Sequence, residues 1–181
     1  ETFAGYVIES VAGRGGMGVV YCARQLRRRR TVALKVVTAA LASDPAFRER
    51  FERESEIAAS IEHSNVIPVY GVGDENGVLY IVMRFVEGTD MAAAIAADGR
   101  IEPHRAVSMI GQVCSALDAA HARGLVHRDV KPANVLLARE GNLEHVYLTD
   151  FGLAKRLASG GETQTGTFVG TFDYSAPEQF E

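Results

Sequence analysis

The chain has 181 residues, of which 47% are hydrophobic, and a formal net charge of −4. This composition predicts a soluble globular protein with a sizeable core, and the negative charge gives no general attraction to nucleic acid. The sequence contains no apolar run of about 18 residues and no basic start followed by an apolar stretch, so we predict neither a membrane segment nor a signal peptide. Cys22 and Cys114 match no metal-ligand spacing, which indicates a reducing compartment.

The first 85 residues alternate short strand-like runs with one charged helix. The runs rich in β-branched residues are 7–11, 19–23, 31–37, 66–72 and 78–83, and we expect them to form a five-stranded antiparallel sheet. A basic run, Arg27 to Arg30, fits a solvated hairpin turn. The composition changes near Val86-Glu87-Gly88, where we place a hinge between two lobes, 1–85 and 86–181.

A glycine-rich turn, Gly13-Arg14-Gly15-Gly16-Met17-Gly18, joins the first two predicted strands. Glycines in such a turn let backbone N–H groups approach phosphate oxygens closely. Taken alone, the turn is about as well explained as a flexible hairpin. A dinucleotide-binding site fits less well, because a strand rather than a helix follows.

The run 31–37 carries one charged residue, Lys35, and strand periodicity puts it on the same face as Ala33. A lysine in a strand is more often a solubility residue at a sheet edge. The helix that follows suggests another reading, because it contains a carboxylate in need of a cation.

That helix is predicted to begin with Asp44 as its N-cap and Pro45 in its first turn. At 100° per residue, Glu54 falls in the middle of an apolar face formed by Phe47, Phe51, Ala58 and Ile61. A carboxylate on such a face costs several kcal/mol unless a cation meets it. We therefore predict a buried or half-buried partner for Glu54, and Lys35 is the candidate.

A second long helix is predicted over about 102–123, with Gly124 as a C-cap. Its apolar residues form one row at Ala106, Ile110, Val113, Leu117 and Ala120 and a second at Val107 and Cys114. A stripe this wide predicts cover on more than one side.

The segment His127-Arg128-Asp129-Val130-Lys131-Pro132-Ala133-Asn134 carries the strongest signal, followed by Asp150-Phe151-Gly152 after the apolar run 146–148. An isolated Asp or Asn in a loop is usually a cap or turn residue. This combination is rare by chance, and Asp and Asn oxygens suit Mg²⁺.

Together with Ala176-Pro177-Glu178, these motifs resemble the catalytic domain of Hanks-type (eukaryotic-type) bacterial Ser/Thr protein kinases, over about 5–178. The resemblance implies an α+β, bilobal protein-kinase fold, with a five-stranded antiparallel sheet and one regulatory helix in the N-lobe and a mainly helical C-lobe. Since the chain ends at Glu181, we expect the C-lobe to be incomplete.

The resemblance also implies transfer of the γ-phosphoryl group of ATP, with Mg²⁺ or Mn²⁺, to Ser or Thr of protein substrates. Asp129 would accept the proton of the attacking hydroxyl, Lys131 would steady the phosphoryl charge, and Lys35 would hold phosphates while paired with Glu54. Asn134 and Asp150 match the metal ligands. The residues expected around the nucleotide are Gly13, Gly15, Gly16, Gly18, Val20, Ala33, Lys35, Met83, Arg84, Val86 and Leu136.

Regulation is expected on the segment after Asp150. A phosphate on Thr163 or Thr165 would pair with Arg128, and Thr171 would hydrogen-bond the catalytic Asp and Lys. By resemblance, the chain would be cytoplasmic, alone or as part of a membrane-anchored receptor kinase, with homodimerisation possible for autophosphorylation. The alternatives are a nucleotide-binding pseudokinase or inactive fragment acting as an interaction module, and a kinase acting on small molecules such as aminoglycosides.

Overall fold

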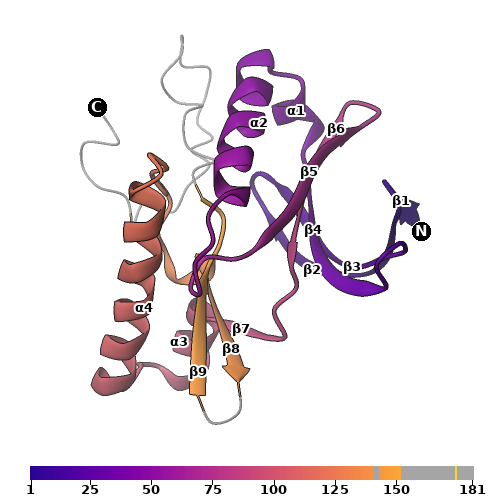
Figure 1. The fold of residues 1–181 in the computed structure, drawn as a ribbon. Helices are drawn as coiled ribbons and strands as arrows, with labels where there is room; N and C mark the ends of the chain where they lie inside the picture. The colour runs from indigo at the N-terminus through magenta and orange to yellow at the C-terminus, as the bar shows by residue number, and fades with distance from the viewer. Residues whose placement is uncertain (141–142, 152–173, 175–181) are drawn as a thin grey trace, which may run out of the picture.

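In the computed structural model, the structure describes residues 1–140, 143–151 and 174. Two groups of elements are visible in Figure 1. The first is an antiparallel sheet covered on one side by α1 (Ala39–Ala42) and α2 (Pro45–Ala59), and the second contains α3 (Met91–Asp98), α4 (Pro103–His121) and a smaller sheet. No helix within the described residues is long and apolar enough to cross a membrane.

The larger sheet has six strands in the order β1-β2-β3-β4-β6-β5, and all neighbours are antiparallel. The strands are β1 (Thr2–Phe3), β2 (Tyr6–Gly15), β3 (Gly18–Gln25), β4 (Arg30–Val37), β5 (Val69–Glu75) and β6 (Val78–Arg84). The predicted count of five was therefore too low by one. The additional strand, β1, is only two residues long, too short for an alternating pattern to show in the sequence.

Strand β4 shows the predicted alternation of side chains. Val32 and Leu34 are fully buried on one face of the sheet, whereas Ala33 and Val37 pack on the other face with Phe51 of α2. Lys35 is 6% exposed, so it lies within the layer between the sheet and the helix. The sheet thus directs one lysine inward.

Helix α2 begins as predicted. The Asp44 side chain accepts a hydrogen bond from the Ala46 N–H at 2.9 Å, and Pro45 is the first helical residue. The Phe47 and Phe51 rings stack at 6.0 Å between the helix and the sheet. Glu54 is 7% exposed, which confirms its predicted position on the buried face.

The segment after α2 is hydrogen-bonded to residues 146 and 148. The Asn65 carbonyl accepts from the Leu148 N–H at 2.8 Å, and the Leu148 carbonyl accepts from the Ile67 N–H at 3.0 Å. The Asn65 side chain also donates to the Val146 carbonyl at 2.9 Å. Val66 therefore pairs with Leu148 in an isolated parallel bridge instead of beginning β5, as the sequence had suggested.

The second group of elements is built around α4. The smaller sheet consists of β7 (Gly88–Asp90), β8 (Val135–Glu140) and β9 (Leu143–Leu148), and a short 3₁₀ helix covers Pro132–Asn134. One face of α4 is buried through Met109, Val113, Ala116 and Ala120. The helix is capped at Ala122, before the predicted Gly124, which follows with φ 73° in the turn that ends the helix.

The opposite side of α4 differs from the prediction. Val107 is 72% exposed, Ile110 is 51% exposed and Cys114 is exposed. Within the described ranges, the second apolar row, Val107 and Cys114, and Ile110 of the first row therefore have no cover. An apolar pattern indicates that a face favours burial, but it does not identify the element that would bury it.

Candidate active site

A cleft separates the glycine-rich turn of the larger sheet from the segment 127–134. It consists of two hollows, of about 550 and about 460 Å³. Gly13, Val20, Asp90, Ala133 and Asp150 line both hollows, so the two form one continuous cleft. Its volume is in the range of small-molecule and cofactor sites.

Gly18 has a structural role at the base of the glycine-rich turn. Its φ is 155°, and a β-carbon there would lie 1.9 Å from the Val36 carbonyl oxygen of β4. Gly18 therefore allows β3 to pass against β4 at this point. Gly13 and Gly15 have open space around them, and both line the cleft.

The rest of the lining brings together residues far apart in the sequence. Ala33 of β4 and Met83 of β6 are register partners on neighbouring strands, and both face the second hollow. Leu136 of β8 lies on the other side of it. The structure brings all eleven residues expected around the nucleotide to this cleft.

The segment around Asp129 is held by short-range contacts. Lys131 Nζ lies 2.8 Å from Asp129 Oδ2. The Asn134 side-chain amide donates to the Asp129 carbonyl at 2.8 Å and to Asp129 Oδ2 at 3.2 Å. The 3₁₀ turn places Asn134 beside Asp129, which fixes the Asp129 carboxylate at the edge of the cleft.

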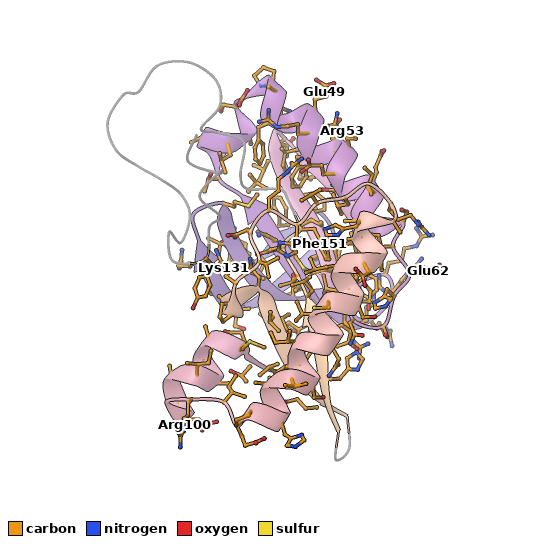
Figure 2. The ribbon with its side chains drawn as sticks, turned by 90° about the vertical axis from the view of Figure 1, so that its left-hand side faces the viewer. Glu49, Arg53, Glu62, Arg100, Lys131 and Phe151 are labelled. Carbon is orange, nitrogen blue, oxygen red and sulfur yellow. The ribbon has the colours of Figure 1, made fainter. Side chains whose placement is uncertain are left out.

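His127 is buried beneath this segment. Its Nδ1 accepts from the Asp129 N–H at 3.3 Å, so Nε2 carries the proton and donates to the Thr149 carbonyl at 2.9 Å. Burial lowers the pKa of His127 below its usual value, which favours the neutral ring. The ring packs 4.7 Å from Phe151, which lies in the interior between α2 and α4 in Figure 2. His127 supports the segment as a neutral residue.

Two ion pairs depart from the expected arrangement. Lys35 Nζ lies 2.7 Å from Asp150 Oδ1, and Arg128 Nη1 lies 3.0 Å from Glu54 Oε1. Glu54 thus has the cation that its burial requires, but the cation is Arg128, and the predicted Lys35–Glu54 pair is wrong for this structure. Burial predicts that a partner exists, but several cations can meet that requirement.

Two of these four residues also have unusual backbone conformations. Arg128 and Asp150 have φ of 60° and 62°, in the left-handed region that residues other than glycine seldom adopt. Such conformations cluster at functional sites. Here they occur in the more exposed member of each ion pair.

The donor set suits a magnesium ion. Asn134 and Asp150 both line the cleft, and the Asn134 amide nitrogen is engaged with Asp129, which leaves its side-chain oxygen as the ligand atom. Within the described ranges, no group of three or more His, Cys, Asp and Glu side chains forms a metal site by itself. Mg²⁺ commonly takes only one or two protein ligands and completes its shell with water and phosphate.

Sequence reasoning missed one carboxylate of the cleft, Asp90. Asp90 lines both hollows, and its carboxylate accepts from the Ala93 N–H at 2.9 Å as the N-cap of α3. An Asp directly before an apolar run is a helix-start signal that could have placed it at a helix N-terminus. The regulatory candidates Thr163, Thr165 and Thr171 lie outside the described residues.

Comparison with known proteins places this geometry in context. A family model described as the protein kinase domain matches residues 6–181. The Mycobacterium tuberculosis (strain ATCC 25618 / H37Rv) proteins named serine/threonine-protein kinase PknH and PknE are 46% and 44% identical over 178 residues, 98% of this chain. The chain spans only 28% and 31% of their lengths.

Solved structures of kinase domains are also similar to this chain. A crystal structure of the Mycobacterium tuberculosis PknI kinase domain is similar with a TM-score of 0.77 at 40% identity, covering 85% of this chain and 62% of that one. A double mutant of that domain gives a TM-score of 0.79 at 38% identity, covering 86% and 64%. The expected α+β fold class is thereby confirmed, with six strands in place of five in the larger sheet.

Proposed function

Because the chain belongs to the protein kinase domain family and has its fold, we propose that it transfers the γ-phosphoryl group of ATP to Ser or Thr hydroxyls of proteins. One observation carries the proposal: Lys35, Asp129 and Asp150 face a single cleft that begins at a glycine-rich turn. These are the residue types that phosphoryl transfer needs, since the protein supplies mainly position and charge.

In this proposal the catalytic loop orients and deprotonates the attacking hydroxyl. Asp129 accepts the proton on its carboxylate, which Asn134 and Lys131 hold from two sides. Lys131 then faces the group being transferred. Mg²⁺, bound with ATP, supplies neutralisation of the phosphate charge, and Asn134 and Asp150 are the residues that would hold it.

The nucleotide would lie along the second hollow. The small Ala33 leaves room for a flat ring, and Met83 closes the rear of the hollow. Backbone groups of Arg84 and Val86 would bind the ring edge, and the glycine-rich turn would cover the phosphates. The proposal thus includes a nucleotide-binding lobe, 1–85, and a second lobe, 86–181, that carries the catalytic loop.

The substrate and regulation follow from neighbouring residues and from the relatives. Lys131, two residues after Asp129, favours Ser or Thr acceptors, and the relatives are named serine/threonine-protein kinases. We propose activation by phosphorylation at Thr163 or Thr165, in a homodimer where needed, with Thr171 bonding the catalytic Asp and Lys. The cytoplasm supplies the required ATP and reducing conditions.

The test measures transfer of radiolabelled phosphate from ATP to a protein substrate by the full chain. Asp150→Asn and Lys35→Met should each lower the rate by at least about 100-fold, because the first removes a carboxylate that would hold the metal ion and the second removes the cation that would hold the nucleotide phosphates. Asp118→Asn, at an exposed position of α4, is the matched control and should leave the rate unchanged. Rates equal to wild type in the Asp150→Asn and Lys35→Met proteins would overturn the proposal.

A second candidate is nucleotide binding without transfer, as in a pseudokinase. It is favoured by one observation, the engagement of Asp150 with Lys35, which occupies a carboxylate oxygen that a metal would need. Tight Mg²⁺-dependent ATP binding by a wild-type protein that transfers no phosphate would support this candidate. Transfer to an aminoglycoside in preference to protein would indicate a small-molecule kinase.

A further inference from the structure

The turn between β3 and β4 carries a concentrated positive charge that phosphoryl transfer does not use. Four consecutive arginines, Arg27 to Arg30, follow Leu26 in a chain whose net charge is −4. The rest of the chain therefore carries an excess of acidic groups. The run lies in the hairpin turn that the sequence predicted, between the end of β3 at Gln25 and the start of β4 at Arg30. We call residues 26–30 the basic tip.

The side chains of the basic tip are open to solvent. Arg27, Arg28 and Arg29 are exposed, and among the described residues none of the three has an ion-pair partner. Leu26 is 53% exposed beside them. Like charges in one turn repel each other, and an exposed aliphatic side chain gains nothing from water. These side chains are therefore free to meet a partner outside the chain.

Backbone hydrogen bonds close the turn that presents these side chains. The Arg29 N–H donates to the Gln25 carbonyl at 2.8 Å, and the Leu26 N–H donates to the Gly5 carbonyl at 3.3 Å. Arg29 has a φ of 50°, in the left-handed region that favours glycine. Turn geometry alone therefore does not account for an arginine at this position.

An aromatic ring from β5 borders the basic tip. The Arg30 guanidinium lies 3.6 Å from the centroid of the Tyr70 ring, and Arg30 Nε donates to Gln25 Oε1 at 2.8 Å. Tyr70 is itself 40% exposed. Arg and Tyr side chains have apolar bodies and polar ends, which suits them to the boundary between lipid headgroups and acyl chains. Cations, an aliphatic side chain and an amphipathic ring thus meet at one end of the sheet.

We propose that the basic tip docks on the surface of an anionic lipid bilayer, with its arginines among the headgroups and Leu26 inserted between them. The tip is the convex end of a hairpin, and its residues line neither hollow of the cleft. A convex end meets a broad surface of many headgroups better than it encloses one phosphate group. A bilayer also buries Leu26, which a soluble polyanion would leave in water.

Docking by the basic tip leaves the cleft accessible. The tip and the glycine-rich turn lie at opposite ends of β3, about 23 Å apart at about 3.3 Å per residue. In Figure 1 this end of the sheet lies beside β1, on the side away from α4. An anionic surface repels the acidic remainder of the chain, so the tip sets the orientation of the docked protein. The inference goes beyond the proposed function and does not depend on phosphoryl transfer.

The main test measures cosedimentation of the full chain with vesicles of equal parts phosphatidylglycerol and phosphatidylcholine. The wild type should bind these vesicles and should not bind vesicles of phosphatidylcholine alone. The double variant Arg27→Gln/Arg28→Gln should bind about 25-fold more weakly, because each arginine near an anionic surface contributes about a factor of five. Arg53→Gln/Arg100→Gln removes two exposed arginines labelled in Figure 2, so it is the matched control and should bind like the wild type.

Insertion of Leu26 has its own readout, because the chain contains no tryptophan. Leu26→Trp places a single indole at the basic tip. Its fluorescence should shift to shorter wavelength on the mixed vesicles and be quenched by brominated lipid. Val107→Trp, at a position of α4 that is 72% exposed, is the control and should show neither change.

A third variant measures what the apolar side chain contributes to docking. Leu26→Ser should weaken binding to the mixed vesicles by roughly tenfold, since it removes most of the apolar surface that would enter the lipid. Val107→Ser should leave binding unchanged. All of these positions are exposed, and thermal unfolding of each variant verifies that it is folded.

The outcomes decide between a bilayer and other partners. A wild type that does not bind the mixed vesicles, an Arg27→Gln/Arg28→Gln variant that binds like the wild type, or a Leu26→Trp indole that stays in water would each overturn the proposal. If polyglutamate or single-stranded DNA binds the wild type more tightly than the mixed vesicles do, the partner is a soluble polyanion and the bilayer is wrong. Weaker binding of the tip variants together with the Leu26→Trp shift supports docking.

Discussion

The catalytic loop and the layer beneath α2 are neighbours that are organised differently. In the loop, Asp129 is already in contact with Lys131 and Asn134 through residues at most five positions away. Beneath α2, Glu54 depends on Arg128, 74 residues along the chain. Local contacts form with the turn itself, whereas distant ones depend on how α2 lies on the sheet. The Asp129 carboxylate is therefore held by its own segment, whereas Glu54 is held by a residue from a distant one.

The largest effect is expected from a change to Asp129, the central residue of the catalytic loop. Asp129→Asn should lower kcat by about 10²- to 10⁴-fold, the usual contribution of a general base, because the amide cannot accept the proton. Nucleotide affinity and the free energy of unfolding should change little, since the amide keeps the shape and one acceptor oxygen. Steady-state kinetics and urea denaturation measure these quantities. A large loss of stability would mean that the Asp129 charge supports the fold.

A smaller effect is expected from loosening α2. Phe51→Leu should lower the free energy of unfolding by about 1–2 kcal/mol, less than the 3–5 kcal/mol of a full truncation to alanine. Phe51 is 2% exposed and stacks with Phe47 against the sheet, so the smaller side chain leaves a gap. Urea denaturation monitored by circular dichroism gives the value. Glu49→Ala, on the exposed side of the same helix in Figure 2, should change it by less than about 0.5 kcal/mol.

The smallest effect is expected from His127, the buried residue beneath the catalytic loop, through the pH dependence of the free energy of unfolding. Because burial lowers the pKa of His127 in the folded state, the unfolded chain binds a proton below the usual pKa of 6.5 while the folded chain does not. The free energy of unfolding should therefore fall as the pH drops below 6.5, by at most about 1.4 kcal/mol per unit for one proton, until the folded pKa is reached. His127→Gln should show a shallower pH dependence between pH 7.5 and 5.5. Parallel curves for the two proteins would contradict the assignment.

Several features were predictable from sequence because their causes are local. Asp44 and Pro45 begin α2 as expected, since capping depends on adjacent residues. The burial of Glu54 followed from helical periodicity, and the position of Lys35 followed from strand alternation. The residues around the cleft were identified because the sequence motifs resemble those of protein kinases. Such a resemblance implies which residues far apart in the chain come together, and the pattern of a single sequence does not.

Other features were beyond the reach of the sequence for physical reasons. The partner of Glu54 was predicted wrongly because Lys35 and Arg128 are both cations next to the layer that contains Glu54. The position of α2 decides which of the two cations Glu54 meets. The apolar residues Val107 and Ile110 suggested a covered face that is exposed in the described residues. Periodicity determines which side chains share a face, but tertiary packing decides what meets them.

The hydrogen bonds from Asn65 to Leu148 and Val146 hold the segment that follows α2. This segment begins where the helix ends, at Ala59, so a swing of α2 about that end would move each residue in proportion to its distance from Ala59. With a rise of about 1.5 Å per residue, Glu54 lies about 8 Å from the fulcrum and Pro45 about 21 Å, so a rotation of about 20° moves them by about 3 and 7 Å. A displacement of about 7 Å at Pro45 would thus correspond to about 3 Å at Glu54, comparable to the length of one hydrogen bond. The Pro45 end is itself held by Arg48, which pairs with Asp74 of β5 and donates to the Ala42 carbonyl at 3.0 Å, so a swing of the helix must first break these contacts.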